Sequence, residues 1–479
     1  METATEKKTP MNAKEADVSF RDRIATVDAS GKRKWIYALK PKGKFYNYRT
    51  LVSGLFFSVF LTLPFIYING RPLFLFNIPK AKFILFGQVF WPQDFFIFGI
   101  TMVTFVVFIV LFTAAFGRLF CGWVCPQTIF MEMLFRKIEY AIEGNAGQQK
   151  TLANAPWISQ KVFKKTLKHI VFFLLAFIIA NYFLAYVIGI KDLWKIITEP
   201  VSQHVGGFFS LLVFSAVFYA VYAFFREQAC TVVCPYGRLQ GVLLDKNSMI
   251  VAYDYKRGEP RGNAKKVKAD NINLGDCVDC FQCVHVCPTG IDIRNGTQLE
   301  CVNCTACIDA CDDVMTKVHK PTGLIRYASE NGIEKGAHLR YTNRMKLYTS
   351  LLILLFALLV GLLATRKDVD ATIMRTPGQL YQERGTTEIS NLYNIKVANK
   401  TIKEVPLTIK LEDRDGTIEI IGEHHNINVA AEGQGAGSFF IVLPAKSIRQ
   451  RKTAIKLGLY EGNKKIDVII TNFLGPVTN

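Results

Sequence analysis

The chain has 479 residues, half of them hydrophobic, and its 58 Lys and Arg against 39 Asp and Glu give a formal net charge of +19. This length allows several folding units. So much apolar sequence beside so much positive charge disfavours a soluble enzyme, and a nucleic-acid-binding protein would need a basic groove or helix on a soluble domain. The long apolar runs flanked by charge are instead typical of a membrane protein.

Five apolar stretches are long enough to cross a bilayer as helices, which takes about 20 residues each. The stretches are residues 51–68, 95–116, 169–188, 208–225 and 347–364. No cleavable signal peptide is visible, because a long polar segment precedes the first apolar run. That first run is expected to act as an uncleaved signal.

The orientation of these spans is predicted from the positive charge of the segments between them. Residues 1–49, 117–168 and 226–346 carry 12, 8 and 17 Lys and Arg, whereas 69–94 and 190–206 carry 3 and 2. Because loops rich in Lys and Arg stay in the cytoplasm, the N-terminus is predicted to be cytoplasmic and the C-terminal segment periplasmic, in a bacterial inner membrane. The basic N-terminal segment is expected to be a solvated, partly disordered tail, with docking onto anionic lipid as the alternative.

All twelve cysteines fall in four motifs, and none lies in the last 168 residues. The motifs are Cys121/Cys125, Cys230/Cys234, Cys277/Cys280/Cys283/Cys287 and Cys301/Cys304/Cys307/Cys311. Spacings this short and regular indicate metal-ligand sets that are kept reduced in a cytoplasm, rather than disulfides. On the predicted topology, all four motifs face the inner side of the membrane.

The two four-cysteine runs have the spacing of a bacterial ferredoxin, in which the fourth cysteine of each run binds the other cluster. We therefore predict one [4Fe–4S] cluster on Cys277, Cys280, Cys283 and Cys311, and a second on Cys301, Cys304, Cys307 and Cys287. A pair of zinc sites is the alternative, but the repeated run of four favours iron and sulfur. His285, inside the first run, is interpreted as a spacer because four cysteines are already supplied.

The second and fourth spans end alike, in Arg118-Leu-Phe-Cys121-Gly-Trp-Val-Cys125-Pro and Arg226-Glu-Gln-Ala-Cys230-Thr-Val-Val-Cys234-Pro. Residues four apart share one face of a helix, so each pair is predicted to clamp one soft metal ion. The proline after each second cysteine disfavours helix and predicts a free loop, and Arg118 and Arg226 are expected to favour thiolates. Thiolates select Cu(I), which makes copper the leading hypothesis; a redox-active dithiol and simple packing are the alternatives.

After the fifth span, residues 366–479 show short alternating runs that predict β-strands. The runs are Ile389–Val397, Val405–Leu411, Thr417–Ile421, Ser438–Leu443, Ala454–Leu459 and Ile466–Thr471, with turns predicted at Asp415-Gly416, Gly433–Gly437 and Glu461-Gly462-Asn463. About seven short strands in some 100 residues indicate an immunoglobulin-like sandwich.

The predicted architecture is therefore multi-domain: an α-helical membrane bundle of five spans, an inserted two-cluster ferredoxin domain and a C-terminal all-β domain. The predicted parts are a basic cytoplasmic segment (1–48), a four-helix membrane domain (49–250), the cytoplasmic ferredoxin domain (251–346), the fifth membrane helix (347–365) and the periplasmic immunoglobulin-like domain (366–479).

Together these motifs resemble the FixG/RdxA/CcoG accessory proteins of the cbb-type cytochrome c oxidase. The resemblance rests on Cys121-Gly-Trp-Val-Cys125-Pro-Gln, Cys230-Thr-Val-Val-Cys234-Pro-Tyr-Gly, Asp254-Tyr-Lys-Arg-Gly-Glu-Pro-Arg261, both ferredoxin runs and Asn391-Leu-Tyr-Asn-Ile-Lys. It covers almost the whole chain, although the Cys-Gly-Trp-x-Cys-Pro element is shared with quinol-dehydrogenase-like polyferredoxins.

The resemblance implies a cupric reductase that reduces Cu(II) to Cu(I) on the cytoplasmic side and supports copper-centre assembly of the oxidase. The implied partners are membrane lipid, oxidase-assembly or copper-transfer proteins and an electron donor, without nucleic acid; a homodimer is left open. The alternatives are a polyferredoxin that passes electrons from quinol to a respiratory reductase, and a copper chaperone without turnover. No nucleotide-binding motif is present, so electrons are expected from a partner or from quinol.

Overall fold

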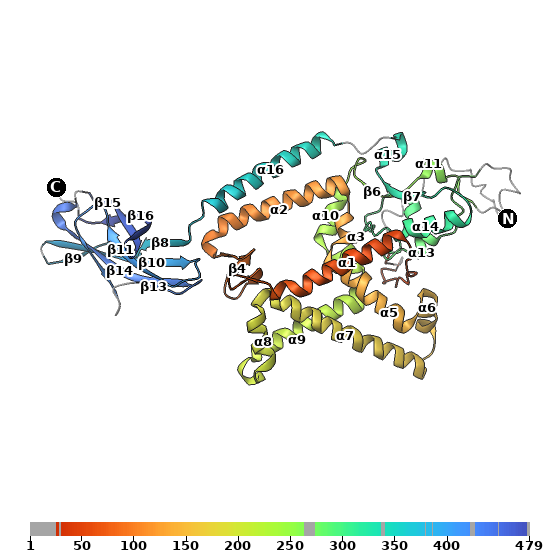
Figure 1. Cartoon of the computed structure of the whole chain (residues 1–479), viewed down its shortest axis with the longest axis horizontal. Helices are drawn as coiled ribbons and strands as arrows, with labels where there is room; N and C mark the ends of the chain where they lie inside the picture. Colours follow the sequence, from red (N-terminus) through yellow and green to blue (C-terminus); the bar gives the residue numbers. More distant parts are fainter. Residues whose placement is uncertain are drawn as a thin grey trace, which may run out of the picture. The chain divides into compact units, whose positions relative to one another are not determined.

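The computed structural model describes residues 25–27, 30–262, 274–336, 341–378, 380–385, 387–421, 427–448 and 450–476 (Figure 1). Contacts divide the chain into two compact units. The first unit lies within Met1–Ile66 and Val103–Leu354, and the second lies within Tyr67–Met102 and Leu355–Asn479.

Within the described residues, five helices are long and apolar enough to cross a membrane, as predicted. They are α1 (Lys44–Thr62, continued by η2, Leu63–Phe65), α2 (Phe95–Phe116), α7 (Ser159–Ile188), α9 (Val205–Ala220, continued by the π-helical η6, Val221–Phe225) and α16 (Asn343–Ala364). The first helix ends before Ile68, which lies in a strand instead. Helix α7 begins ten residues before the predicted start, because its first turns carry Lys165 and Lys168, which pair with Glu143 on another helix.

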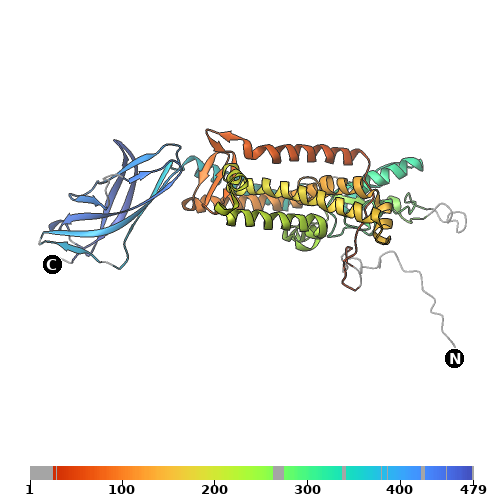
Figure 2. The same cartoon turned by 90° about the horizontal axis from the view of Figure 1, so that it is seen from below.

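The helical part of the first unit is built around an aromatic core. Helices α7 and α9 lie side by side (Figure 2), and Phe135, Phe172 and Tyr222 pack between them and the short helices after the second span. The remaining helices of this region are α3 (Leu119–Trp123), α4 (Pro126–Thr128), the π-helical η4 (Ile129–Phe135), α5 (Arg136–Glu143), α6 (Ala146–Asn154), α8 (Ile190–Thr198), η5 (Val201–Gln203), the π-helical η7 (Ala229–Val233) and α10 (Pro235–Leu243).

The segment with the eight ferredoxin cysteines forms a small α/β core in the first unit. Strands β6 (Ile250–Tyr253) and β7 (Ile325–Ala328) pair antiparallel, and Val251, Leu324 and Ile325 are buried against the cysteines. The other elements are α11 (Tyr255–Gly258), α13 (Gln282–His285), η8 (Ile293–Asn295), α14 (Ala306–Lys317) and α15 (Glu330–Lys335).

Residues 30–43, which we call the N-terminal strap, lie against this core and the ends of the membrane helices. The backbone N–H of Leu39 donates to the carbonyl of His285 at 2.8 Å, and Arg33 forms an ion pair with Glu227 at 2.8 Å. Trp35 lies between the guanidinium groups of Arg33 and Arg226. The prediction of a solvated tail is therefore wrong for residues 30–43, whereas residues 1–24 and 28–29 lie outside the described residues.

The second unit contains the predicted β-sandwich. One sheet has the order β12-β14-β10-β8 with β9 paired to β10, and the other has the order β13-β11-β15-β16. Tyr393, Phe439, Leu457 and Phe473 are fully buried between the sheets. The strands are β8 (Val369–Arg375), β9 (Gln382–Arg384), β10 (Glu388–Asn399), β11 (Val405–Leu411), β12 (Thr417–Ile420), β13 (Ile427–Val429), β14 (Gln434–Pro444), β15 (Lys452–Glu461) and β16 (Lys464–Leu474); η9 spans Ala445–Ser447.

Six of these strands are predicted by the sequence, whereas β8, β9 and β13 are additional. The turn predicted at Gly433–Gly437 is wrong, because Gln434–Gly437 begins β14 and pairs with β10. The strand contains glycines because there is little room for a side chain: a Cβ on Gly435 would lie 2.9 Å from the side chain of Val429.

A three-stranded sheet in the first outer loop also belongs to the second unit. It consists of β3 (Phe74–Asn77), β4 (Lys82–Leu85) and β5 (Gln88–Phe90), after a hairpin of β1 (Tyr67–Ile68) and β2 (Arg71–Pro72) and before η3 (Pro92–Asp94). Its Ile84, Val89 and Trp91 share a core with Ala398 of β10. The buried carboxylate of Asp94 pairs with Arg366 and Lys400, each at 2.6 Å. The sequence does not indicate this association.

Candidate functional site

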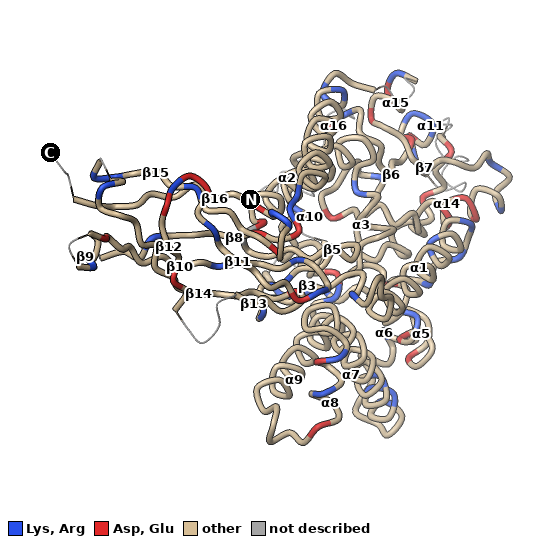
Figure 3. Tube along the Cα trace, turned by 60° about the vertical axis from the view of Figure 1, so that its left-hand side comes forward, with Lys and Arg blue, Asp and Glu red and all other residues tan. Residues whose placement is uncertain are grey.

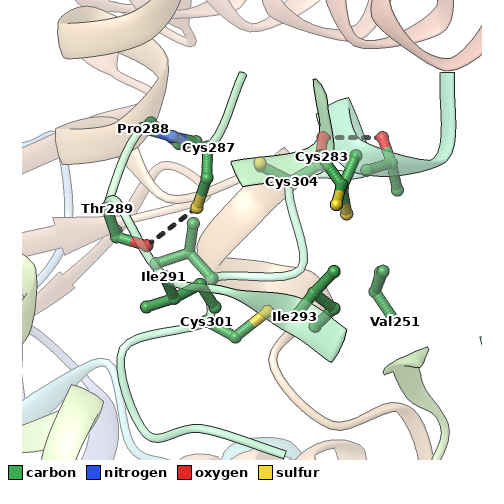
Figure 4. Close-up of a pocket in the computed structure, with 12 residues that line it drawn as sticks. Val251, Cys283, Cys287, Pro288, Thr289, Ile291, Ile293, Cys301 and Cys304 are labelled. Carbon is green, nitrogen blue, oxygen red and sulfur yellow. Dashed lines mark hydrogen bonds between the residues drawn. The ribbon is translucent and has the colours of Figure 1, made fainter. Parts of the chain in front are cut away.

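Five cysteines from both ferredoxin runs line one small cavity. They are Cys283, Cys287, Cys301, Cys304 and Cys307. Figure 4 shows Cys287, Cys301 and Cys304 approaching the cavity from separate stretches of chain, with Ile291 and Ile293 beside them. The five include the four that the sequence predicts as ligands of the second cluster, together with Cys283, which it predicts for the first; the ligand assignment stays a prediction.

Four cysteines line a second cavity, and one of them, Cys283, lines both. Cys277, Cys280, Cys283 and Cys311 surround it, together with apolar side chains that include Met315 and Leu324. Cys280 is exposed, whereas the other three are buried. The fourth cysteine of each run thus lies beside the first three of the other run, as a crossed pair of ligand sets requires.

The same left-handed backbone conformation recurs in the loops of both cysteine runs. The residue before the second cysteine and the residue after it have positive φ: Asp279 (54°) and Phe281 (57°) in the first run, and Asn303 (53°) and Thr305 (65°) in the second. This left-handed conformation is rare for residues other than glycine. Its repetition lets cysteines spaced three apart turn toward one point instead of following a helix or strand.

The donor chemistry of both cavities fits iron–sulfur clusters. Burial raises the pKa of the thiols to about 12 for Cys283, Cys301 and Cys311 and to about 11 for Cys304. At neutral pH such groups are thiolates only beside a cation. Eight sulfur donors in two apolar cavities are what two clusters with cysteine ligands require.

Two hydroxyl-bearing side chains also line the cysteine cavities. The buried hydroxyl of Thr289 lies 3.3 Å from Sγ of Cys287, as drawn in Figure 4, and Tyr253 lines the cavity of Cys277 and donates its hydroxyl to Oε1 of Glu259 at 3.3 Å. If the sulfur of Cys287 is a thiolate, the hydroxyl of Thr289 must be the donor. Sequence reasoning missed both residues, because a threonine or tyrosine near a cysteine run carries no signal of its own.

The two helix-end thiol pairs do not lie on continuous helices. Cys121 is in α3 and Cys230 is in η7, but Cys125 and Cys234 are the N-cap residues of α4 and α10. The prediction that each pair shares one helix face is therefore wrong. The loop predicted after each pair is also wrong, because the proline occupies the first position of a new helix, where its missing N–H costs nothing.

Arg118 joins both thiol repeats to the loop that carries Cys301. Its Nε donates to Oε1 of Gln240 at 2.7 Å, one terminal nitrogen donates to the carbonyl of Gly237, and the other donates to the carbonyls of Leu299 and of Cys301, the latter at 3.1 Å. Only 4% of Arg118 is exposed. Gln240 also contacts Sγ of Cys121 at 3.2 Å.

Two glycines of the repeats allow this close approach. A Cβ on Gly122 would lie 2.5 Å from the carbonyl oxygen of Val302, and one on Gly237 would lie 2.6 Å from the carbonyl oxygen of Cys230. No side chain fits at such distances. Cys121 consequently packs in one hydrophobic cluster with Val302 and Cys304, so the first thiol repeat abuts the cavity lined by Cys304.

The four thiols of the two repeats lie near one another. Cys121 is within electrostatic range of Cys125 and Cys234, and Cys230 is within range of all three others. Burial raises the pKa of Cys121 to about 11 and that of Cys230 to about 12. Among the residues that the structure describes, however, no three Cys, His, Asp or Glu side chains are grouped closely enough to share one metal ion.

The expectation that Arg118 and Arg226 produce thiolates is not met. Arg118 does lower the pKa of Cys121, but the effect of burial is larger. Arg226 instead forms a two-bond ion pair with Glu139, with contacts of 3.0 and 2.6 Å. Sequence reasoning missed Gln240 and Glu139, because their partners come from distant segments.

Three family profiles match this chain. The one described as a 4Fe-4S dicluster domain matches residues 225–330, and the one described as a 4Fe-4S binding domain matches residues 98–143, which hold the first thiol pair. The immunoglobulin-like fold at the C-terminus of FixG matches residues 359–476.

Individual proteins match longer parts of the chain. Protein RdxA of Cereibacter sphaeroides is 29% identical over 428 residues, which cover 86% of this chain and 90% of RdxA. Nitrogen fixation protein FixG of Rhizobium meliloti is 36% identical over 62% of this chain and 58% of FixG. Over most of its length, the chain is therefore similar to proteins named FixG and RdxA.

The solved structure of a FixG-related protein from Vibrio parahaemolyticus is 18% identical in sequence to this chain, with a TM-score of 0.20. The match covers 23% of this chain and 97% of the solved one.

Similarity to FixG and RdxA confirms the resemblance found in the sequence. With the five membrane helices and the iron–sulfur profiles, it makes the chain a multi-pass membrane protein that transfers electrons through iron–sulfur clusters.

Proposed function

We propose that this chain reduces Cu(II) to Cu(I) at its four helix-end thiols and thereby supports copper-centre assembly of a cbb-type cytochrome c oxidase. The observation that carries the proposal is the placement of the thiols. Both repeats meet at Arg118 and Gln240, and Cys121 packs against Cys304 in one hydrophobic cluster. A copper ion held there would lie beside a cysteine-lined cavity.

The ligand assignment within this proposal follows the two cavities. Cys277, Cys280, Cys283 and Cys311 would hold one [4Fe–4S] cluster, and Cys301, Cys304, Cys307 and Cys287 would hold the other. Such clusters transfer single electrons when bound, which matches the one electron that Cu(II) needs. The first thiol repeat lies beside the second of these ligand sets.

The thiols are better ligands for Cu(I), the product of the reaction, than for Cu(II), its substrate. Soft thiolates bind Cu(I) in preference to harder ions, and a pair of thiolates can satisfy Cu(I). Cys121 is buried, whereas Cys125, Cys230 and Cys234 are partly accessible. Copper would therefore enter at the accessible thiols and be held next to Cys121.

The orientation in the membrane is part of the same proposal. The cysteine-bearing segments of the first unit would face the cytoplasm and the β-sandwich the periplasm, because Lys and Arg concentrate in 1–49, 117–168 and 226–346. Reducing conditions in the cytoplasm would keep the thiols available.

A second candidate is a polyferredoxin that passes electrons from quinol to a respiratory reductase. It is favoured by the match of a 4Fe-4S binding profile to residues 98–143, which contain Cys121 and Cys125. On this alternative the two thiol pairs would bind no copper.

The deciding experiment replaces Cys121, Cys125, Cys230 and Cys234 by serine in the full chain, purified without oxygen. We expect the variant to keep its iron and sulfide but to lose both copper binding and Cu(II) reduction by the pre-reduced protein, because serine offers a hard, protonated oxygen. Variants that change one pair at a time show whether both pairs are needed. Unchanged copper binding and reduction would refute the proposal, and copper binding without reduction in the unaltered protein would indicate a chaperone.

A further inference from the structure

An open groove of about 870 Å³ lies between the N-terminal strap and helices α13 and α14. Leu39–Phe45 line one side, while Gln282, Val286 and Ala310 lie on the other. These last three residues immediately precede Cys283, Cys287 and Cys311 in the sequence. The groove is therefore a place where a solvent-borne molecule can come close to both cysteine-lined cavities.

The segment that lines the groove, residues 39–45, is held at both ends by hydrogen bonds, so the groove is formed before anything binds. At one end, Leu39 N–H donates to the carbonyl of His285 at 2.8 Å. At the other, the buried carboxylate of Asp309 accepts the N–H groups of Phe45 at 3.1 Å and Tyr46 at 2.8 Å, at the start of α1. A Cβ on Gly43 would overlap Asp309, which shows how closely the strap passes α14.

The lining of this groove carries a net positive charge, because four lysines (Lys40, Lys42, Lys44 and Lys317) stand against three aspartates (Asp309, Asp312 and Asp313). Lys317 pairs with Asp313, while Asp309 accepts the amides at the start of α1 and Asp312 accepts the N–H of Gly323 at 2.8 Å. The exposed Lys40, Lys42 and Lys44 form no ion pair in the part of the chain that the structure describes. Figure 3 colours the basic positions blue and the acidic positions red along α1 and α14.

We propose that this groove is the docking site of a reduced electron-carrier protein with an acidic surface. Docked there, the carrier would lose one electron to the chain, and each Cu(II) gains one electron when it becomes Cu(I). Basic groups around a mixed polar and apolar groove suit the small, transient contacts of electron transfer, in which charge mainly accelerates encounter. The transfer of this electron to Cu(II) rests on the proposed function, whereas the docking of the carrier at this groove does not.

The lining favours a protein over a lipid headgroup. Apart from Lys44 and Phe45, every residue that lines the groove lies outside the membrane-spanning helices. Thr316 and Thr322, on the far side from the strap, belong to the ferredoxin segment. A lipid bound through Lys44 alone would leave most of the groove unused.

The test measures the rate of electron uptake rather than copper chemistry. The full chain, with its clusters loaded, is mixed without oxygen with a reduced plant-type [2Fe–2S] ferredoxin, which is acidic, and bleaching of the cluster absorption is followed. We expect Lys40→Glu/Lys42→Glu/Lys44→Glu to slow this second-order step by about tenfold or more and to reverse its dependence on salt. Reduction by methyl viologen radical, a small cation that needs no docking, should not slow.

The matched control is Lys150→Glu/Lys246→Glu/Lys335→Glu, which changes the same charge at exposed lysines outside the groove. Its rate should change less than twofold. Equal slowing in both triple variants, or no slowing in either, would overturn the proposal; so would loss of binding to phosphatidylglycerol vesicles with an unchanged ferredoxin rate. To separate loss of charge from disturbance of the strap by Glu, the Gln triple variant is measured too and should slow the reaction less while keeping full iron content. If the chain takes up electrons as expected but does not reduce Cu(II), the proposed function is wrong and the docking site is still supported.

Discussion

An arginine precedes each of the two Cys-x-x-x-Cys-Pro motifs, Arg118 before the first and Arg226 before the second, but the two arginines have different partners. Arg118 hydrogen bonds to Gln240 and to backbone carbonyls, among them that of Cys301 in the second ferredoxin run. Arg226 forms an ion pair with Glu139 of α5 and stacks on Trp35. The first repeat is thus attached to the ferredoxin segment, and the second is attached to the helical bundle and the N-terminal strap.

This difference shows that the repeated motif specifies a local shape and not a role. In both repeats a residue with positive φ ends the span, Gly117 (58°) or Arg226 (52°), and a short helix with the first cysteine follows. What each arginine does depends on its tertiary neighbours. A buried guanidinium beside carbonyls organises several segments, whereas one beside a carboxylate mainly neutralises charge.

The largest expected effect is that of Arg118→Met. The substitution leaves the carbonyls of Gly237, Leu299 and Cys301 and the Gln240 side chain without their donor, at a cost of about 1–3 kcal/mol for each buried group left unsatisfied. We expect the purified chain to lose about half of its iron, because the loop with Cys301 is no longer held, and to bind copper poorly. Iron, sulfide and copper analysis of the folded fraction measures this.

Arg226→Met is the matched control for Arg118→Met. Breaking the buried pair with Glu139 should destabilise the chain by about 3–5 kcal/mol, but the folded fraction should keep its full iron content. If both variants lose iron to the same extent, the distinction between the two repeats is wrong.

Glu139→Gln should make stability less sensitive to acid. Burial alone would raise the pKa of Glu139, but Arg226 and the other nearby cations outweigh it and lower the pKa to about 2, from 4.5. Since the folded-state pKa is depressed, Glu139 stabilises the fold above about pH 4.5 and the stabilisation disappears as pH falls toward 2; its size is about 3 kcal/mol. Thermal unfolding followed from pH 7 down to about pH 2.5 should show the gap between variant and parent narrowing below about pH 4.5. A constant gap would contradict the assignment.

Gly122→Ala tests the contact between the first repeat and the ferredoxin loop. The new Cβ would meet the carbonyls of Val302 and Asn303 at 2.5 and 2.7 Å, and overpacking of this kind costs about 1–3 kcal/mol. We expect lower stability together with an altered electron paramagnetic resonance spectrum of one reduced cluster. Gly99→Ala, where nothing lies within 4 Å, is the control and should leave the spectrum unchanged.

The smallest effect is expected from Thr289→Val. Removing the hydroxyl that lies 3.3 Å from Cys287 Sγ should cost about 1 kcal/mol of stability. Hydrogen bonds to cluster sulfurs help to set reduction potentials, so one of the two reduction steps should shift to a more negative potential. A redox titration in which both steps stay unchanged would exclude this hydrogen bond.

The sequence predicts the parts of this protein that short patterns specify. Spans follow from runs such as 95–116, and the cysteine grouping follows from spacing alone. The sandwich strands that it predicts alternate clearly, whereas β13 is only three residues long.

What the sequence does not predict depends on distant partners. The sheet formed by β3, β4 and β5 is buried by Ala398 and tied through Asp94 to Lys400, about three hundred residues away. Likewise, the meeting of the two thiol repeats depends on Arg118 reaching Gly237 and Gln240. The non-helical conformations of Cys125 and Cys234, by contrast, are local, because each cysteine precedes a proline.

The measurement that tests the central claim most directly is copper K-edge X-ray absorption on the full chain, reduced without oxygen and then given one equivalent of Cu(II). The account predicts an edge characteristic of Cu(I) and a first shell of sulfur, both lost when Cys121, Cys125, Cys230 and Cys234 are changed to serine. An edge of Cu(II) with nitrogen or oxygen neighbours, or a sulfur shell that survives the four substitutions, would contradict it.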